Sequence, residues 1–143
     1  MSRRILVPMD GSPKSIEGLE YALSTFPAEE ITVIYVMTPF DTWNSKVGRP
    51  SRDSVEDWYD EAHTEAERVL DEARELATEH GVDISTATDI GEPWRTIVTY
   101  TEEHDVDHVI MGSHGRTDDS SLALGSVAET VMRRSPVLVS IVR

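Results

Sequence analysis

Three glycines and a serine near the C-terminus have the spacing of a loop that could bind an anion. They are Gly112, Gly115 and the pair Gly125-Ser126, and the first of them follows the apolar run Val109-Ile-Met. Glycine lets the backbone approach a ligand closely because it has no side chain. If a helix begins at Gly125-Ser126, its first N–H groups and the serine hydroxyl would face such an anion. Each piece also fits a simpler role, since glycines after a strand often form turns and Ser126-x-x-Glu129 matches a capping box.

A second polar segment follows the first apolar run of the chain. Ile5-Leu-Val leads into Pro8-x-Asp10-Gly-Ser12, where Asp10 is either a ligand-binding carboxylate or a turn residue. In open α/β sheets, ligands bind beyond the carboxyl ends of the strands, at the point where the strand order reverses. If the order is 3-2-1-4-5, the first and fourth strands are neighbours. The loops that follow these two strands would then line one crevice.

The elements that would position these segments alternate along the chain. Apolar runs predict strands at 5–7, 31–36, 82–89, 106–111 and 136–142, and apolar residues at helical spacing predict helices that begin near 13, 53, 93 and 126. The longest helix should run from about 53 to 80, and Gly81 is well placed to end it. The alternation predicts an α/β fold with right-handed crossovers. We expect a single five-stranded parallel sheet of order 3-2-1-4-5 with helices on both faces.

The chain is strongly acidic. It has 27 Asp and Glu residues against 13 Lys and Arg, a formal net charge of −14, and its only lysines are Lys14 and Lys46. This balance excludes nucleic acid and anionic membranes as expected partners, because both require a basic surface. Adaptation to molar salt, where the Debye length falls to ~3 Å, is favoured over an ordinary acidic surface.

Other features narrow the class of protein further. The 143 residues suit one domain, no cysteine is present, and neither a signal peptide nor a membrane-spanning run is evident, so we expect a cytoplasmic protein. A helix-to-strand junction separates His104 from His108, so we predict no metal site there and expect both on the surface. No nucleophile–base pair is evident in the loops, and we predict no catalytic residue.

The spacing taken whole is more specific than its parts. Gly-x2-Gly-x9-Gly-Ser, with Val106-Asp-x-Val-Ile-Met before it and Pro136-Val-Leu-Val after it, closely resembles the ATP-binding signature of the universal stress protein family. Ile5-Leu-Val-Pro-x-Asp-Gly-Ser resembles that family's first strand and turn. The resemblance covers the whole chain. It implies one domain over residues 1–143 with a Rossmann-like fold of the adenine nucleotide α-hydrolase type.

The resemblance also implies an ATP site, commonly with Mg²⁺. Asp10 and the backbone at Val36 would hold the adenine and ribose, and Gly112 would lie against the ribose. Gly115 would lie near the phosphates, with Ser126 and the amide of Val127 on the phosphate tail. The complete set of predicted ligand-binding residues is Pro8, Asp10, Val36, Gly112, Gly115, Arg116, Gly125, Ser126 and Val127.

The function expected from this resemblance is that of a nucleotide-binding stress regulator. Two alternatives remain, a slow ATPase and a dimeric interaction module that works without nucleotide. The run 136–142 is apolar and should form a sheet edge, which invites pairing with a second chain. We therefore predict a homodimer through this last strand. A monomer in which the loop at 38–52 covers the edge is the alternative.

Overall fold

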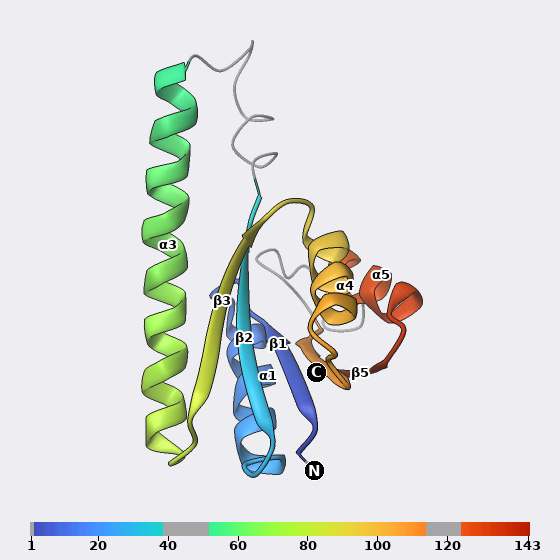
Figure 1. Cartoon of the computed structure of the whole chain (residues 1–143). Coiled ribbons are helices and arrows are strands. Elements are labelled where there is room, and N and C mark those ends of the chain that lie inside the picture. The colour runs from blue at the N-terminus through green and yellow to red at the C-terminus, as the bar shows by residue number, and fades with distance from the viewer. Residues whose placement is uncertain (1, 39–51, 114–123) are drawn as a thin grey trace.

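Strands and helices alternate in the computed structural model, which describes residues 2–38, 52–113 and 124–143 (Figure 1). All strand pairs are parallel and the order is β3-β2-β1-β4-β5, which confirms the predicted α/β fold and sheet order. The elements are β1 (Arg4–Pro8), α1 (Pro13–Thr25), β2 (Glu30–Met37), α3 (Arg52–Glu79), β3 (Ile84–Ile90), α4 (Pro93–Glu103), β4 (His108–Gly112), α5 (Ser126–Arg134) and β5 (Leu138–Val142).

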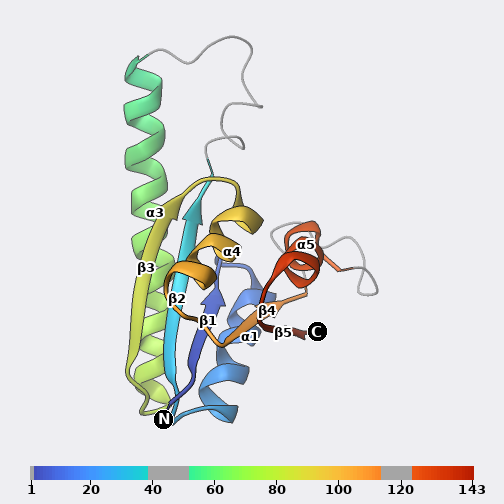
Figure 2. The ribbon, with the colours of Figure 1, turned by 45° about the vertical axis from the view of Figure 1, so that its right-hand side comes forward.

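The sheet is covered on both faces, so the molecule has two apolar cores. Helices α1 and α3 cover one face, where Ile5 and Val7 point, and helices α4 and α5 cover the other, where Leu6 points (Figure 2). All three of these β1 side chains are at most 1 % exposed. Strands buried on both faces need apolar residues at every position, which explains why they appear in the sequence as uninterrupted apolar runs.

Local signals set the helix ends. The side chain of Ser12 caps α1 by accepting a hydrogen bond from the N–H of Ser15 at 3.2 Å, and Pro13 occupies the first turn. Gly81 follows α3 with a φ of +67°, in the left-handed region that glycine adopts at least cost. These two helix ends lie where the sequence predicts them.

The later strands begin about two residues after their predicted starts. Before β5, Pro136 has no N–H, and the Ser135 hydroxyl accepts the hydrogen bond of the Val137 N–H, so this segment turns. Before β4, Asp105 has a φ of +53°, and the Val106 N–H donates to Thr101 in the last turn of α4. Local hydrogen bonds therefore keep Val106 and Val137 outside the strands, although both residue types are common in strands.

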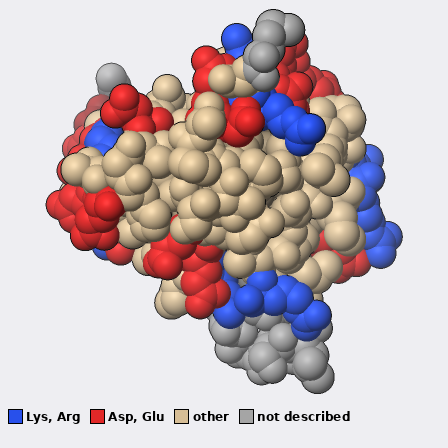
Figure 3. All heavy atoms as spheres, turned by 90° about the horizontal axis from the view of Figure 1, so that it is seen from below, with Lys and Arg blue, Asp and Glu red and all other residues tan. Residues whose placement is uncertain are grey.

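Acidic residues remain in excess on α3, the longest helix. Arg68 pairs with Glu65 and Arg74 with Asp71, each at 2.6 Å, but such exposed pairs contribute little to stability. At the end of the molecule where the strands begin, charged side chains lie around the rim of an uncharged surface (Figure 3). In the described ranges, none of the helices has both the length and the apolar character needed to cross a bilayer.

The expectation of a surface position is wrong for His108. Its side chain is 3 % exposed, its Nε2 lies 2.7 Å from the Ser140 hydroxyl, and the Phe26 ring packs edge-on at 5.5 Å. Burial, with a smaller contribution from the charge of Arg3, lowers the pKa of His108. The position is buried because alternate side chains of β4 point at α1. His104, in contrast, is exposed at the end of α4.

Candidate functional site: a cleft at the switch point of the sheet

A cleft of ≈ 470 Å³ lies at the carboxyl ends of the strands. It lies where β1 has β2 as its neighbour on one side and β4 on the other, so that the strand order reverses there. This is the switch point at which open α/β sheets bind ligands. Seven of the nine predicted residues line it, namely Pro8, Asp10, Val36, Gly112, Gly125, Ser126 and Val127. Gly115 and Arg116 lie outside the described residues.

One wall of the cleft is apolar. Ile34 comes from β2, Ile97 from α4 and Met111 from β4, so three elements that are distant in sequence form this wall. Small-molecule sites generally combine such apolar surface with a few polar groups that fix orientation. This wall therefore offers apolar surface to an uncharged part of a ligand.

Asp10 is the one ionisable side chain among the described lining residues. Its Oδ1 accepts a hydrogen bond from the N–H of Ser12 at 2.9 Å, so the turn role considered for this residue is real. The turn uses one of the two carboxylate oxygens. The same bond orients the carboxylate at the edge of the cleft, so a turn role and a ligand role are compatible.

The beginning of α5 forms another side of the cleft. Gly125 is the N-cap residue and makes no side-chain capping bond, while Ser126 is the first helical residue. The capping box considered for Ser126 is therefore not formed. The first N–H groups of a helix lack intrahelical acceptors and carry a partial positive charge. Since Gly125, Ser126 and Val127 all line the cleft, this helix end can bind an anion there.

Gly112 lines the cleft, but packing explains why it is glycine. A Cβ at this position would lie 2.5 Å from the carbonyl carbon of Lys14 and 2.9 Å from the N of Ser15. The first turn of α1 thus passes directly against the end of β4. Gly18 sits nearly as close, since a Cβ there would lie 3.2 Å from the N of Gly112. The contact with ribose remains a prediction.

Ser113 was not recognised from the sequence, although its backbone connects the end of β5 to the beginning of α5. It is 2 % exposed and lines the cleft. Its N–H donates to the carbonyl of Val142 at the end of β5, at 2.9 Å, and its carbonyl accepts from the N–H of Gly125 at 2.6 Å. The end of β5 therefore helps to position the N-terminus of α5. Ile34, Ile97 and Met111 of the apolar wall were also missed, because no local motif marks them.

A doubly wound α/β fold with a ligand-sized cleft at its switch point defines a broad class of ligand-binding proteins, and sequence comparison narrows that class. The model of the universal stress protein family matches residues 1–143, so the chain belongs to this family.

Individual relatives agree with this assignment. The chain is 35 % identical over 144 residues to universal stress protein MJ0531 of Methanocaldococcus jannaschii, a match that covers 96 % of this chain and 81 % of the relative. It is 31 % identical to MJ0577 of the same organism, over 97 % of this chain and 94 % of the relative.

Solved structures have the same fold. That of MJ0577 superposes with a TM-score of 0.84 at 26 % identity, over 99 % of this chain and 96 % of the other. A universal stress protein crystallised in complex with cAMP superposes with a TM-score of 0.72 at 26 % identity, over 99 % and 97 % of the two chains.

Proposed function

We propose that this protein binds an adenine nucleotide, ATP above all, in the switch-point cleft, and that it acts as a stress-response regulator for which the nucleotide is a ligand or switch. The observation that carries the proposal is the convergence of Asp10, Val36 and the N-terminus of α5 on one cleft with an apolar wall. The cAMP complex of a relative at 26 % identity supports an adenine nucleotide as the class of ligand.

In this proposal the two ends of the cleft have different tasks. The apolar wall takes the adenine ring, and Asp10 with the Val36 backbone takes the ribose side. The N–H groups of Ser126 and Val127, with the Ser126 hydroxyl, take the phosphates, because a helix N-terminus favours an anion. Mg²⁺ keeps most of its ligands as water and phosphate oxygens, so it would arrive on the nucleotide and need few protein ligands. We also propose that the protein works in the cytoplasm.

Thermal unfolding with and without nucleotide tests the binding. A ligand that binds only the folded state stabilises it by ~2.7 kcal/mol at a hundred times its dissociation constant. We therefore expect Mg-ATP to raise the melting temperature by several degrees, and AMP and cAMP measured in parallel would rank the ligands. A nucleotide identified after denaturing protein purified in high salt would name the natural ligand directly.

Variants on α5 locate the site. Gly125→Val should remove the nucleotide-dependent shift, because its side chain would fill space at the phosphate end, and Ser126→Ala should reduce it. Thr130→Ala is the matched control, since its hydroxyl bonds the Ser126 carbonyl within the helix and Thr130 does not line the cleft. If no nucleotide shifts the wild-type melting temperature in dilute or in molar salt, the proposal is wrong.

A further inference from the structure

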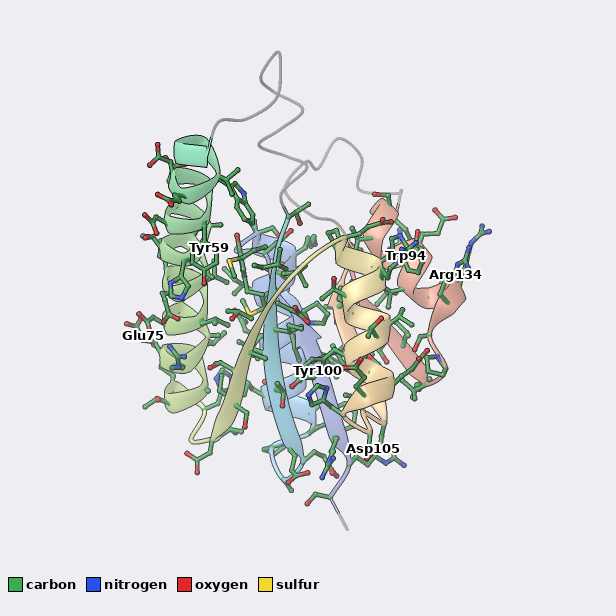
Figure 4. The ribbon with its side chains drawn as sticks, turned by 45° about the horizontal axis from the view of Figure 1, so that its top comes forward. Tyr59, Glu75, Trp94, Tyr100, Asp105 and Arg134 are labelled. Atoms are coloured by element: carbon green, nitrogen blue, oxygen red, sulfur yellow. The ribbon has the colours of Figure 1, made fainter. Side chains whose placement is uncertain are left out.

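The guanidiniums of two arginines lie over one tryptophan ring where α4 and α5 meet. The Cζ of Arg95 and the Cζ of Arg134 each lie 5.3 Å from the centroid of the Trp94 ring. Trp94 is half-buried in the first turn of α4, and its indole N–H donates to the carboxylate of Glu92. Figure 4 shows Trp94 and Arg134 side by side, with the arginine directed outward from α5. We call Arg95 and Arg134 the arginine pair.

The arginine pair differs from most other arginines that the structure describes. Ion pairs join Arg4 to Glu30, Arg68 to Glu65, Arg74 to Asp71 and Arg133 to Glu129. Within the described ranges, neither Arg95 nor Arg134 makes an ion pair, and both are exposed. In a chain with a net charge of −14, two guanidiniums at one ring that make no ion pair are a local excess of positive charge, and the one carboxylate bonded to that ring, Glu92, accepts from the indole N–H.

A cation–π contact with an indole prepares a guanidinium to bind a carboxylate. The flat group is weakly hydrated, and the ring contact restricts its orientation while leaving N–H donors for bidentate hydrogen bonds. Such charge-assisted bonds act at contact distance, so molar salt weakens them less than it weakens long-range attraction. A peptide segment with several carboxylates offers an acceptor to each of the two guanidiniums at the ring.

We propose that the arginine pair on Trp94 is a docking site for an acidic peptide segment of a partner protein. Charge complementarity is the argument for this partner, because the pair offers unpaired donors in an otherwise acidic molecule. A nucleic acid is disfavoured, since its phosphates would extend over the surrounding acidic surface. The proposal does not depend on nucleotide binding. It places the partner on α4 and α5, the helices whose N-terminal parts line the cleft.

Fluorescence anisotropy of a labelled tetraglutamate peptide tests the proposal, with the tetraglutamine peptide as its neutral counterpart. We expect the wild type to bind the acidic peptide only. The double variant Arg95→Gln/Arg134→Gln should bind it at least about tenfold more weakly, the loss expected for charge-assisted hydrogen bonds. The double variant Arg74→Gln/Arg133→Gln has the same net charge and should keep the wild-type affinity, because its arginines are already paired.

A lysine variant separates bidentate binding from charge alone. Arg95→Lys/Arg134→Lys keeps the charge but has only ammonium donors, so it should not restore wild-type affinity. Circular dichroism melts would establish that every variant is folded. Equal losses in the two glutamine double variants, full affinity in the lysine variant, or no binding of the acidic peptide by the wild type would each overturn the proposal.

Discussion

Replacing Gly112 by alanine should destabilise the fold whether or not nucleotide is present. Ordinary contacts to a Cβ begin at 3.4 Å, and the new Cβ would lie 2.5 Å from the Lys14 carbonyl carbon, so α1 and β4 must separate by about 0.9 Å (3.4 − 2.5). Overpacking a core costs ~1–3 kcal/mol. The obstacle here is helix backbone, not a flexible side chain, so we expect about 3 kcal/mol, which lowers the melting temperature by roughly 10 °C.

Gly81→Ala is the matched control. Gly81 has a φ of +67°, and a Cβ at this position would have no atom within 4 Å, so alanine there meets left-handed strain and no clash. That strain costs ~1–2 kcal/mol. Urea unfolding of both variants without nucleotide measures the difference. A Gly112→Ala protein at least as stable as Gly81→Ala would refute the packing argument. If Gly112→Ala is as stable as the wild type but nucleotide no longer raises its melting temperature, glycine is needed at this position for ligand binding and not for packing.

Three further predictions concern pH, salt and assembly. Because burial lowers the pKa of His108, the unfolded chain binds the proton more readily, and the free energy of unfolding should fall as the pH drops below about 6.5. The free energy of unfolding, measured between pH 8 and 5, should fall less in His108→Gln than in the wild type and by the wild-type amount in His80→Gln. A His108→Gln protein whose stability falls with pH as steeply as that of the wild type would contradict this prediction. Dilution from molar salt should lower the melting temperature through unscreened repulsion of the net charge of −14, and a flat profile argues against adaptation to salt. We also expect a homodimer paired through β5, whose Leu138 is 59 % exposed. Leu138→Lys should weaken that dimer, and a wild-type mass near 16.0 kDa in light scattering at micromolar concentration would exclude it.

The sequence predicts the fold well because the apolar runs of the strands and the residues that begin and end the helices are local signals. Apolar runs predict the strands, and the helix expected to begin near residue 13 and the helix expected to end at Gly81 do so in the structure. The starts of β4 and β5 were less predictable, because local hydrogen bonds of the Val106 and Val137 N–H groups compete with hydrogen bonds between the strands of the sheet.

The cleft was predictable only in part. Residues that follow a strand, such as Asp10, belong to motifs and could be recognised, whereas Ile97 and Met111 reach the cleft only through the fold. The burial of His108 depends on the placement of α1 over β4. The packing role of Gly112 has the same origin, because the close approach of Lys14 joins segments that are almost a hundred residues apart.

Packing and hydrogen bonds connect the edge strand β5 to the cleft, and this connection determines which substitution in β5 can test the dimer. Val139 and Ile141 pack into the core beneath α4 and α5, and Val142 accepts the Ser113 N–H, while the Ser113 carbonyl holds Gly125. A lysine at Val139 or Ile141 would therefore disturb the N-terminus of α5 as well as any partner strand. Leu138 is exposed at the opposite end of β5, so Leu138→Lys changes the edge with the least effect on the cleft. If dimerisation orders β5, nucleotide affinity should rise with protein concentration in the wild type. The same affinity should vary less with protein concentration in Leu138→Lys. An equal concentration dependence in both proteins would show that nucleotide binding does not depend on the dimer.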